Sequence, residues 1–381
     1  MINLPNSLKV ESYLLERTLD FKNFSTSYKL FWFNGIYKEI IFGNKTMSFK
    51  KIIARMVATA WYPVIYYKLN LGFQDKLNQI ILYVHETLKV GREENEEYIA
   101  EYIYNSTDRQ LNKMINTISL YVPYRLIRPF YEEQIKFKEK ITNKKISNLE
   151  INNLIQKLSE EDFTSLYRID KKKKEITIND SWVNYITSNQ AIINGWINFK
   201  LVYYLQLRNP NVPAIPFKIY PPIKRDLSKA KNFWKLVISQ RNILDLYTNK
   251  SFNADNLEKY GSISVDHFIP WSFVLHDELW NLVPTFNKIN SCKNNKLPKL
   301  DLYIDRFCDL QFDAFNIIRK DKKNIRYLED YLTINKKVDI NLLLQGNVNK
   351  EEFTYSIKST IIPLYQIAYN QGYDIWHNNV L

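Results

Sequence analysis

The sequence predicts a mainly α-helical protein that carries a small ββα unit near its C-terminal end. Apolar residues recur at helical spacing on both sides of a proline-rich segment, residues 209–225. Two short runs typical of β-strands stand between residues 263 and 283, and a helical pattern follows them. Hydrophobic residues make up 45% of the 381 positions, which is enough for packed cores and excludes a disordered chain.

Residues 1–208 are expected to form a largely helical domain with a recognition, regulatory or assembly role. Two amphipathic stripes follow the i, i+3, i+4, i+7 rule, and Ser48 is a candidate N-cap for the first. The stripes comprise Phe49, Ile52, Ile53, Met56, Val57, Ala60 and Trp61, and then Leu77, Ile80, Ile81, Val84 and Leu88.

An aromatic cluster precedes these stripes. Tyr28, Phe31, Trp32 and Phe33 have rings that could stack on nucleic-acid bases. Burial in a helical core is the more frequent use of such a run, so we assign the cluster to packing.

A β-hairpin is predicted at residues 166–178, with a run of lysines near its tip. Lys172 and Lys173 are candidates for DNA contact, as in the wing of a winged-helix module, and a solvated turn is the alternative. A long helix is expected from Ser181 to Leu207.

The segment 209–225 is predicted to be a linker and the main domain boundary. Prolines at positions 210, 213, 216, 221 and 222 exclude a regular helix there. Lys224 and Arg225 follow, and they are candidates for contact with backbone phosphate or for an ordinary surface pair.

Residues 226–300 contain the predicted ββα unit. Ile263 to Ile269 reads as a strand stopped by Pro270, and Leu279 to Val283 reads as a second strand before Pro284. Thr285 is a candidate N-cap for a helix with Phe286, Ile289 and Lys293 on one side and Asn287, Asn290 and Asn294 on another. The pattern predicts that His267 and Asn290 face one groove.

The residue types around this groove suit phosphodiester hydrolysis. Asp266 and Asn290 offer the hard oxygen ligands that Mg²⁺ prefers, and Mn²⁺ could replace it. His267 is the candidate general base, because imidazole can accept a proton from water near neutral pH. Asn281 is expected to hydrogen-bond across to the first strand and fix the direction of the imidazole ring.

From about Ile243 to Pro298 the sequence resembles the HNH nuclease domain, and most closely that of type II CRISPR effectors. The resemblance rests on six residues in the same order: Asp266, His267, Pro270, Asn281, Asn290 and Lys293. It implies that Asp266 and Asn290 are metal ligands, His267 the general base and Asn281 the orienting residue. Lys293 or Lys288 would add positive charge nearby.

Two features differ from the wider superfamily. Asn290 stands where many members have His, and the paired CxxC motifs of a structural zinc site are missing. Cys292 and Cys308 cannot supply four zinc ligands, so no structural zinc is expected.

Residues 301–381 are expected to be helices that pack on the nuclease domain, with candidates at Leu300–Phe315, Ile325–Leu332 and Phe353–Tyr369. His85, His276 and His377 have no ligand partners at useful spacing, so they are placed outside the site.

A net charge of +13 suits DNA as the partner, although a compositional bias toward Lys, Asn, Ile and Tyr would give the same charge. No signal peptide or membrane-length apolar run is visible, and two cysteines fit a reducing compartment, so a cytoplasmic location is expected.

The predicted function is metal-dependent endonuclease cleavage of DNA, in bacterial anti-phage defence or restriction. A homing or mobile-element nuclease is the alternative within the same chemistry, and a catalytically silent nucleic-acid-binding or assembly protein is the alternative outside it. One such site cuts one strand, so double-strand cleavage requires a homodimer, sequential nicks or a partner protein.

Overall fold

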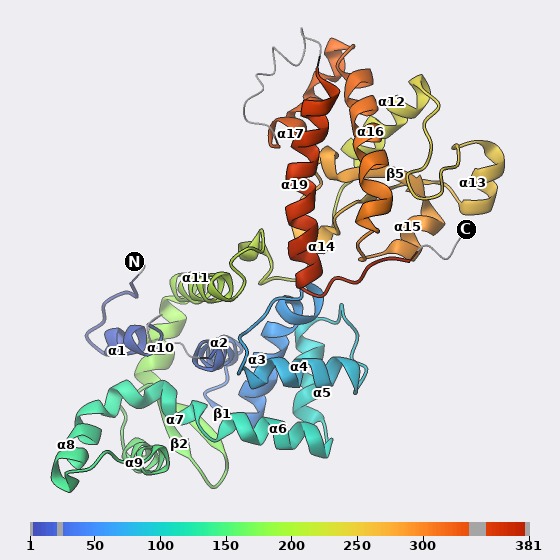
Figure 1. Cartoon of the computed structure of the whole chain (residues 1–381). Helices are drawn as coiled ribbons and strands as arrows, with labels where there is room; N and C mark the ends of the chain where they lie inside the picture. Colours follow the sequence, from blue (N-terminus) through green and yellow to red (C-terminus); the bar gives the residue numbers. More distant parts are fainter. Residues whose placement is uncertain (1–2, 21–25, 335–347, 378–381) are drawn as a thin grey trace. The chain divides into compact units, whose positions relative to one another are not determined.

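The computed structural model describes residues 3–20, 26–334 and 348–377 (Figure 1). The chain forms two compact units: unit 1 comprises residues 1–210 and 215–221, and unit 2 comprises residues 211–214 and 222–381. The chain passes between the units inside the proline-rich segment. The predicted class is confirmed, because the described residues are mostly helical and contain two small antiparallel sheets. Within the described residues, none of the helices combines the length and the apolar character needed to cross a bilayer.

Unit 1 is built around α3, which packs against α2, α4, α5 and α6. The predicted N-cap of α3 is confirmed, since the Ser48 hydroxyl accepts a hydrogen bond from the Lys51 amide at 3.2 Å. The α-helices of this unit are α1 Ser12–Thr18, α2 Tyr28–Ile41, α3 Phe49–Trp61, α4 Lys76–Glu86, α5 Glu96–Asn105, α6 Arg109–Ser119, α7 Val122–Ile127, α8 Glu132–Thr142, α9 Asn148–Glu160, α10 Asp180–Ser188 and α11 Gln190–Arg208.

The aromatic cluster divides between core and surface. Phe31, Trp32 and Phe33 on α2 are buried, which confirms the packing assignment for these three residues. Tyr28, at the first turn of α2, is only half-buried. Its ring lines a cavity.

A buried ion-pair network joins three helices of unit 1. Glu39 of α2 is fully buried and lies 2.6 Å from Arg55 of α3 and 2.9 Å from Lys51. Arg55 also contacts Glu97 of α5 at 2.7 Å. Burial opposes ionisation of Glu39, but the hydrogen bonds from Arg55 and Lys51 outweigh it and hold the pKa of this carboxyl below its usual value.

The hairpin at residues 166–178 is confirmed, with β2 at Tyr167–Asp170 and β3 at Glu175–Ile178. A third strand that the sequence did not predict, β1 at Thr46–Ser48, pairs antiparallel with β3 and makes the order β1-β3-β2.

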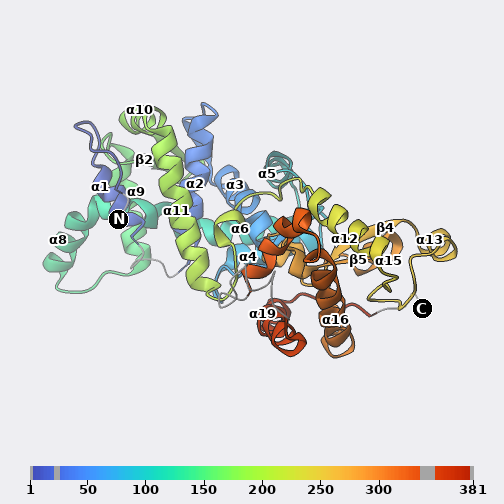
Figure 2. The same ribbon diagram turned by 90° about the horizontal axis from the view of Figure 1, so that it is seen from above.

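The single helix predicted from Ser181 to Leu207 is wrong. α10 ends at Ser188 and α11 begins at Gln190, because the backbone of Asn189 leaves the helical conformation, with φ −116° and ψ 25°. The Tyr185 carbonyl accepts both the backbone amide of Asn189 at 3.2 Å and its side-chain amide at 2.8 Å. α11 lies beside α2 (Figure 2).

Unit 2 surrounds the two-stranded sheet with helices. α12 packs on both strands and on α16, and α16 packs on α19. The α-helices and strands that the structure describes in this unit are α12 Ser228–Gln240, α13 Ala254–Tyr260, β4 Ile263–His267, α14 Trp271–Val274, β5 Leu282–Phe286, α15 Asn287–Lys293, α16 Leu300–Ile318, α17 Glu329–Leu332 and α19 Lys350–Asn370.

The ββα order is as predicted, but the second strand is displaced along the sequence. Leu279–Asn281 forms a 3₁₀ turn and β5 begins at Leu282. Pro284 lies inside β5 opposite Val265, a position that a two-stranded sheet tolerates because one edge of each strand needs no partner. Thr285 is paired with Ser264 in the sheet and is not the N-cap, which is Phe286.

The C-terminal helices α16 and α19 begin at or near the predicted positions. The segment Ile325–Leu332 is not one α-helix, because a 3₁₀ helix at Lys322–Leu328 precedes α17.

Candidate active site

The candidate site lies where α15 crosses β4. Helix α15 follows β5 directly, so the chain turns back over the sheet and presents its polar side chains to the end of β4. Asn290 and Lys293, one turn apart on α15, both bond to residues of β4.

The Asp266 carboxylate is buried, with 4% of its surface exposed, and is held by two side chains. The Tyr247 hydroxyl donates to Oδ2 at 2.5 Å, and the Lys293 Nζ lies 2.9 Å from Oδ2 and 3.2 Å from Oδ1. Burial and the neighbouring Asp266 charge raise the pKa of Tyr247 well above its usual value, so this phenol stays a donor. The carboxylate therefore has a fixed direction and a cation beside it.

Lys293 is fully buried and also donates to the His267 carbonyl at 2.7 Å. The structure thus places this predicted basic residue within the site. Its ammonium group connects the side chain of Asp266 with the backbone of His267.

Asn290 contacts β4 through its amide nitrogen alone. Nδ2 donates to the Ser264 hydroxyl at 2.9 Å and to the Val265 carbonyl at 3.2 Å. Among the described residues, none donates a hydrogen bond to its Oδ1, so the amide oxygen keeps its lone pairs for a ligand.

The His267 ring contacts a carboxylate that the sequence analysis did not identify. Its Nε2 lies 2.7 Å from Oδ1 of Asp277, in the loop between β4 and β5. A carboxylate only accepts hydrogen bonds, so Nε2 carries the proton and Nδ1 keeps the lone pair. Burial lowers the pKa of His267 below its usual value, and the hydrogen bond and charge of Asp277 partly oppose that shift.

Arg225 extends this contact toward the surface. Its guanidinium group lies 4.0 Å from Asp277 and 4.7 Å from the centroid of the Trp271 ring. The structure therefore brings Arg225 beside the site, whereas Lys224 is exposed and has no hydrogen bond or ion pair among the described residues.

Asn281 holds the backbone that follows His267. Its Oδ1 accepts from the Ile269 amide and its Nδ2 donates to the Ile269 carbonyl, both at 2.9 Å, while its own carbonyl accepts from Phe268 at 2.8 Å. Asn281 is fully buried. It contacts the chain beyond β4 and not the imidazole ring, so it can orient His267 only through the backbone.

The three other basic candidates, Lys288, Lys172 and Lys173, are exposed. Lys288 is exposed on α15 and donates to the Lys259 carbonyl at 2.7 Å. Lys172 and Lys173 are exposed at the hairpin tip of unit 1, where Lys173 lies 3.9 Å from Asp170.

The comparison with protein families agrees with this geometry. Residues 245–299 match the HNH endonuclease family. The chain therefore carries an HNH endonuclease domain, and the match contains Asp266, His267, Asn281 and Asn290. Neither the comparison with curated proteins nor that with solved structures found a match.

Sequence reasoning missed two residues of the HNH domain site, Tyr247 and Asp277. Tyr247 lies far before the Asp-His pair in sequence, and Asp277 lies in a loop with no periodic pattern. The residue before it, His276, packs against Trp280 with ring centroids 5.0 Å apart and ring planes tilted by 51°. Burial lowers the pKa of His276 to about 4.

In the parts of the chain that the structure describes, no three His, Cys, Asp or Glu side chains come together as a metal cluster. Cys292 is exposed and Cys308 is buried, and both are free thiols. The oxygen donors of the site are the Asp266 carboxylate and the Asn290 Oδ1 atom.

Proposed function

We propose that this chain is a metal-dependent endonuclease that hydrolyses DNA phosphodiester bonds at Asp266, His267 and Asn290. The observation that carries the proposal is the His267 ring in the HNH domain, held by Asp277 so that Nδ1 keeps its lone pair. A general base needs this form of imidazole, with one nitrogen fixed by a carboxylate and the other able to accept a proton.

The donor set fits Mg²⁺ or Mn²⁺. Asp266 would hold the ion through its carboxylate and Asn290 through Oδ1, the atom that its contacts to β4 leave without a donor. Such an ion would supply positive charge to the scissile phosphate and the departing 3′ oxygen. The Lys293 ammonium group beside Asp266 reduces the negative charge of the site, so we expect modest metal affinity without substrate.

The chain's own residues would carry the proton transfer. His267 Nδ1 takes a proton from the attacking water, and the Asp277 carboxylate stabilises the imidazolium ion that results. Asn281 keeps the backbone after His267 in place. Lys288 and Arg225, both exposed, supply positive charge for DNA phosphates near the site.

We further propose a role in bacterial anti-phage defence or restriction, with an HNH domain of the type II CRISPR effector kind. The six motif residues support the likeness to the HNH domain of type II CRISPR effectors. Unit 1 is helical and larger than the HNH domain, and it supports the defence or restriction role because it offers a separate domain for recognition or regulation. Double-strand cleavage would require a homodimer, two sequential nicks or a partner protein.

The test is incubation of supercoiled plasmid with the purified protein and Mg²⁺ or Mn²⁺, beside EDTA and a His267→Ala variant. We expect metal-dependent nicking or linearisation that the variant loses. Absence of cutting by folded wild-type protein, with equal DNA affinity in metal and EDTA, would favour a silent nucleic-acid-binding protein. Cleavage confined to one long DNA site would favour a homing nuclease.

A further inference from the structure

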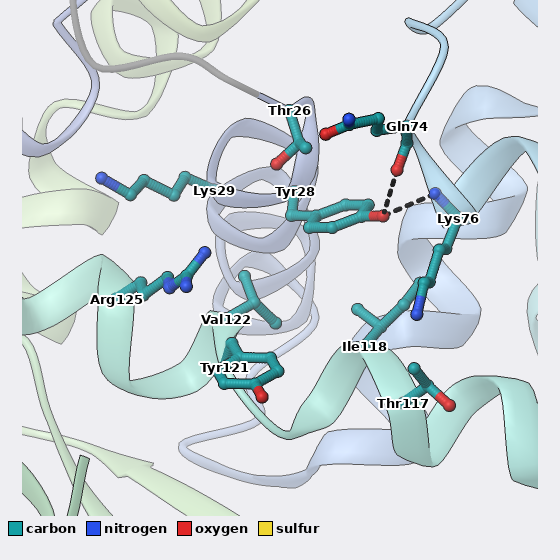
Figure 3. A pocket seen from close by; sticks show the side chains of 10 residues that line it. All are labelled: Thr26, Tyr28, Lys29, Gln74, Lys76, Thr117, Ile118, Tyr121, Val122 and Arg125. Carbon is teal, nitrogen blue, oxygen red and sulfur yellow. Dashed lines mark hydrogen bonds between the residues drawn. The ribbon is translucent and has the colours of Figure 1, made fainter. Parts of the chain in front are cut away.

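Unit 1 contains a cavity of about 250 Å³ that the nuclease proposal does not use (Figure 3). It lies among the start of α2 with Thr26 before it, the start of α4 with Gln74 before it, the end of α6 and the start of α7. The side chains that define its chemistry are Tyr28, Lys29, Lys76, Tyr121 and Arg125.

The cavity is strongly cationic. Lys29, Lys76 and Arg125 line it, and no Asp or Glu is among the lining residues. Within the described ranges 3–20, 26–334 and 348–377, no carboxylate forms an ion pair with any of these three cations. Burial lowers the pKa of Lys29, and the charges of Arg125 and Arg128 lower it further, so positive side chains gather around this part of the cavity.

The cavity also has aromatic and apolar walls. In Figure 3 the Tyr28 ring lies between Lys76 on one side and Lys29 and Arg125 on the other. The Tyr28 hydroxyl accepts a hydrogen bond from the Lys76 backbone amide, which fixes the ring. Tyr121 is 44% exposed at the opposite wall, and buried Val122 forms part of the floor.

We propose that this cavity binds a nucleoside phosphate. The cations would hold the phosphate, and the tyrosine rings would face the planar base, because bases stack on aromatic side chains and phosphates bind Lys and Arg. The ligand would be a free nucleotide or the terminal nucleotide of a nucleic-acid strand. Both sources present the same phosphate and base to the cavity. The cavity volume suits one nucleotide unit, and the rest of the ligand would lie outside the cavity opening.

The test measures binding to the full chain by titration calorimetry in EDTA, so that no cleavage is involved and the result is independent of the nuclease proposal. The probes are ATP, AMP, a 5′-phosphorylated oligonucleotide, the same oligonucleotide without the phosphate, and inorganic phosphate. Arg125→Gln and Lys76→Gln change exposed side chains, so both variants should fold. Lys157→Gln, at an exposed position of α9 in the same unit, is the charge-matched control.

We expect one of two results. If ATP and AMP bind, the ligand is a free nucleotide; if the 5′-phosphorylated oligonucleotide alone binds, the ligand is a strand end. In either case wild type and the control should bind equally, and each cavity variant should bind about tenfold more weakly. Tyr121→Ala should weaken the nucleotide probes and leave inorganic phosphate unchanged. The proposal is overturned if no probe binds, if inorganic phosphate binds as tightly as AMP, or if folded Arg125→Gln and Lys76→Gln bind like wild type.

Discussion

Replacing Asp277 by Asn tests whether the loop carboxylate positions the His267 ring. The 2.7 Å contact joins Asp277, whose side chain is 29% exposed, to the His267 side chain, which is 7% exposed, so the change removes a partly desolvated, charge-assisted hydrogen bond. Such a bond contributes roughly 1.5–3 kcal/mol, which corresponds to about 10- to 100-fold in rate if it is felt in the transition state. Mutations of groups that orient a functional imidazole have similar effects.

The pH profile separates positioning from a merely structural role. Burial lowers the pKa of His267, and Asp277 opposes that shift through its hydrogen bond and its charge. In wild type the base form therefore predominates above a pKa that lies below 6.5, and cleavage is lost as pH falls through it. Asp277→Asn removes the opposing contribution, so the acid limb should move to lower pH while the plateau rate falls.

The assay is single-turnover plasmid nicking between pH 5 and 8 at saturating Mg²⁺, with circular dichroism to verify folding. Asp374→Asn is the matched control, because this exposed carboxylate makes no side-chain hydrogen bond or ion pair among the described residues. An unchanged plateau rate with an unchanged acid limb in folded Asp277→Asn would refute the reasoning.

Three further predictions concern stability and metal. Lys293→Met leaves the Asp266 carboxylate buried without its cation, so the free energy of unfolding of the metal-free protein, measured in urea, should fall by about 3–5 kcal/mol. Lower Mg²⁺ concentrations than for wild type should protect this variant from heat. An unchanged midpoint in both measurements would contradict the prediction. Asn281→Ala leaves the buried amide and carbonyl of Ile269 without partners, so we expect the free energy of unfolding to fall by about 2–3 kcal/mol and cleavage to slow. An unaltered melting temperature would show that the loop is stable without these two hydrogen bonds. Glu39→Gln breaks the ion pairs with Arg55 and Lys51 and should destabilise unit 1 by about 3–5 kcal/mol at pH 7. The wild-type advantage over Glu39→Gln should be full above the pKa of the unfolded carboxyl and should disappear as pH falls through the depressed folded value, and a difference independent of pH would contradict it.

Local patterns in the sequence predicted the helical class, the hairpin at residues 166–178 and the ββα order. These features follow from periodicity and capping, as the Ser48 N-cap shows. The break at Asn189 and the position of Pro284 inside β5 depend on which backbone groups find partners in three dimensions. Sequence spacing alone does not contain that information.

The site shows the same division. The Asp-His pair and the two asparagines are close in sequence, so their spacing alone predicts that one site contains Asp266, His267, Asn281 and Asn290. Tyr247 reaches Asp266 from a preceding segment, and Asp277 reaches His267 from an irregular loop. Contacts of this kind arise from tertiary packing, and only the folded structure identifies them.

Single-turnover cleavage of an end-labelled DNA duplex tests the central claim most directly, with wild type, His267→Ala and Asn290→Ala compared at matched Mg²⁺ and in EDTA. We predict metal-dependent cleavage that leaves 5′-phosphate and 3′-hydroxyl ends, a loss of about 10²–10⁴-fold in His267→Ala, and a loss in Asn290→Ala that high Mg²⁺ partly restores. Cleavage by wild type in EDTA, or equal rates in wild type and folded His267→Ala, would contradict the assignment of this site as a metal-dependent nuclease centre.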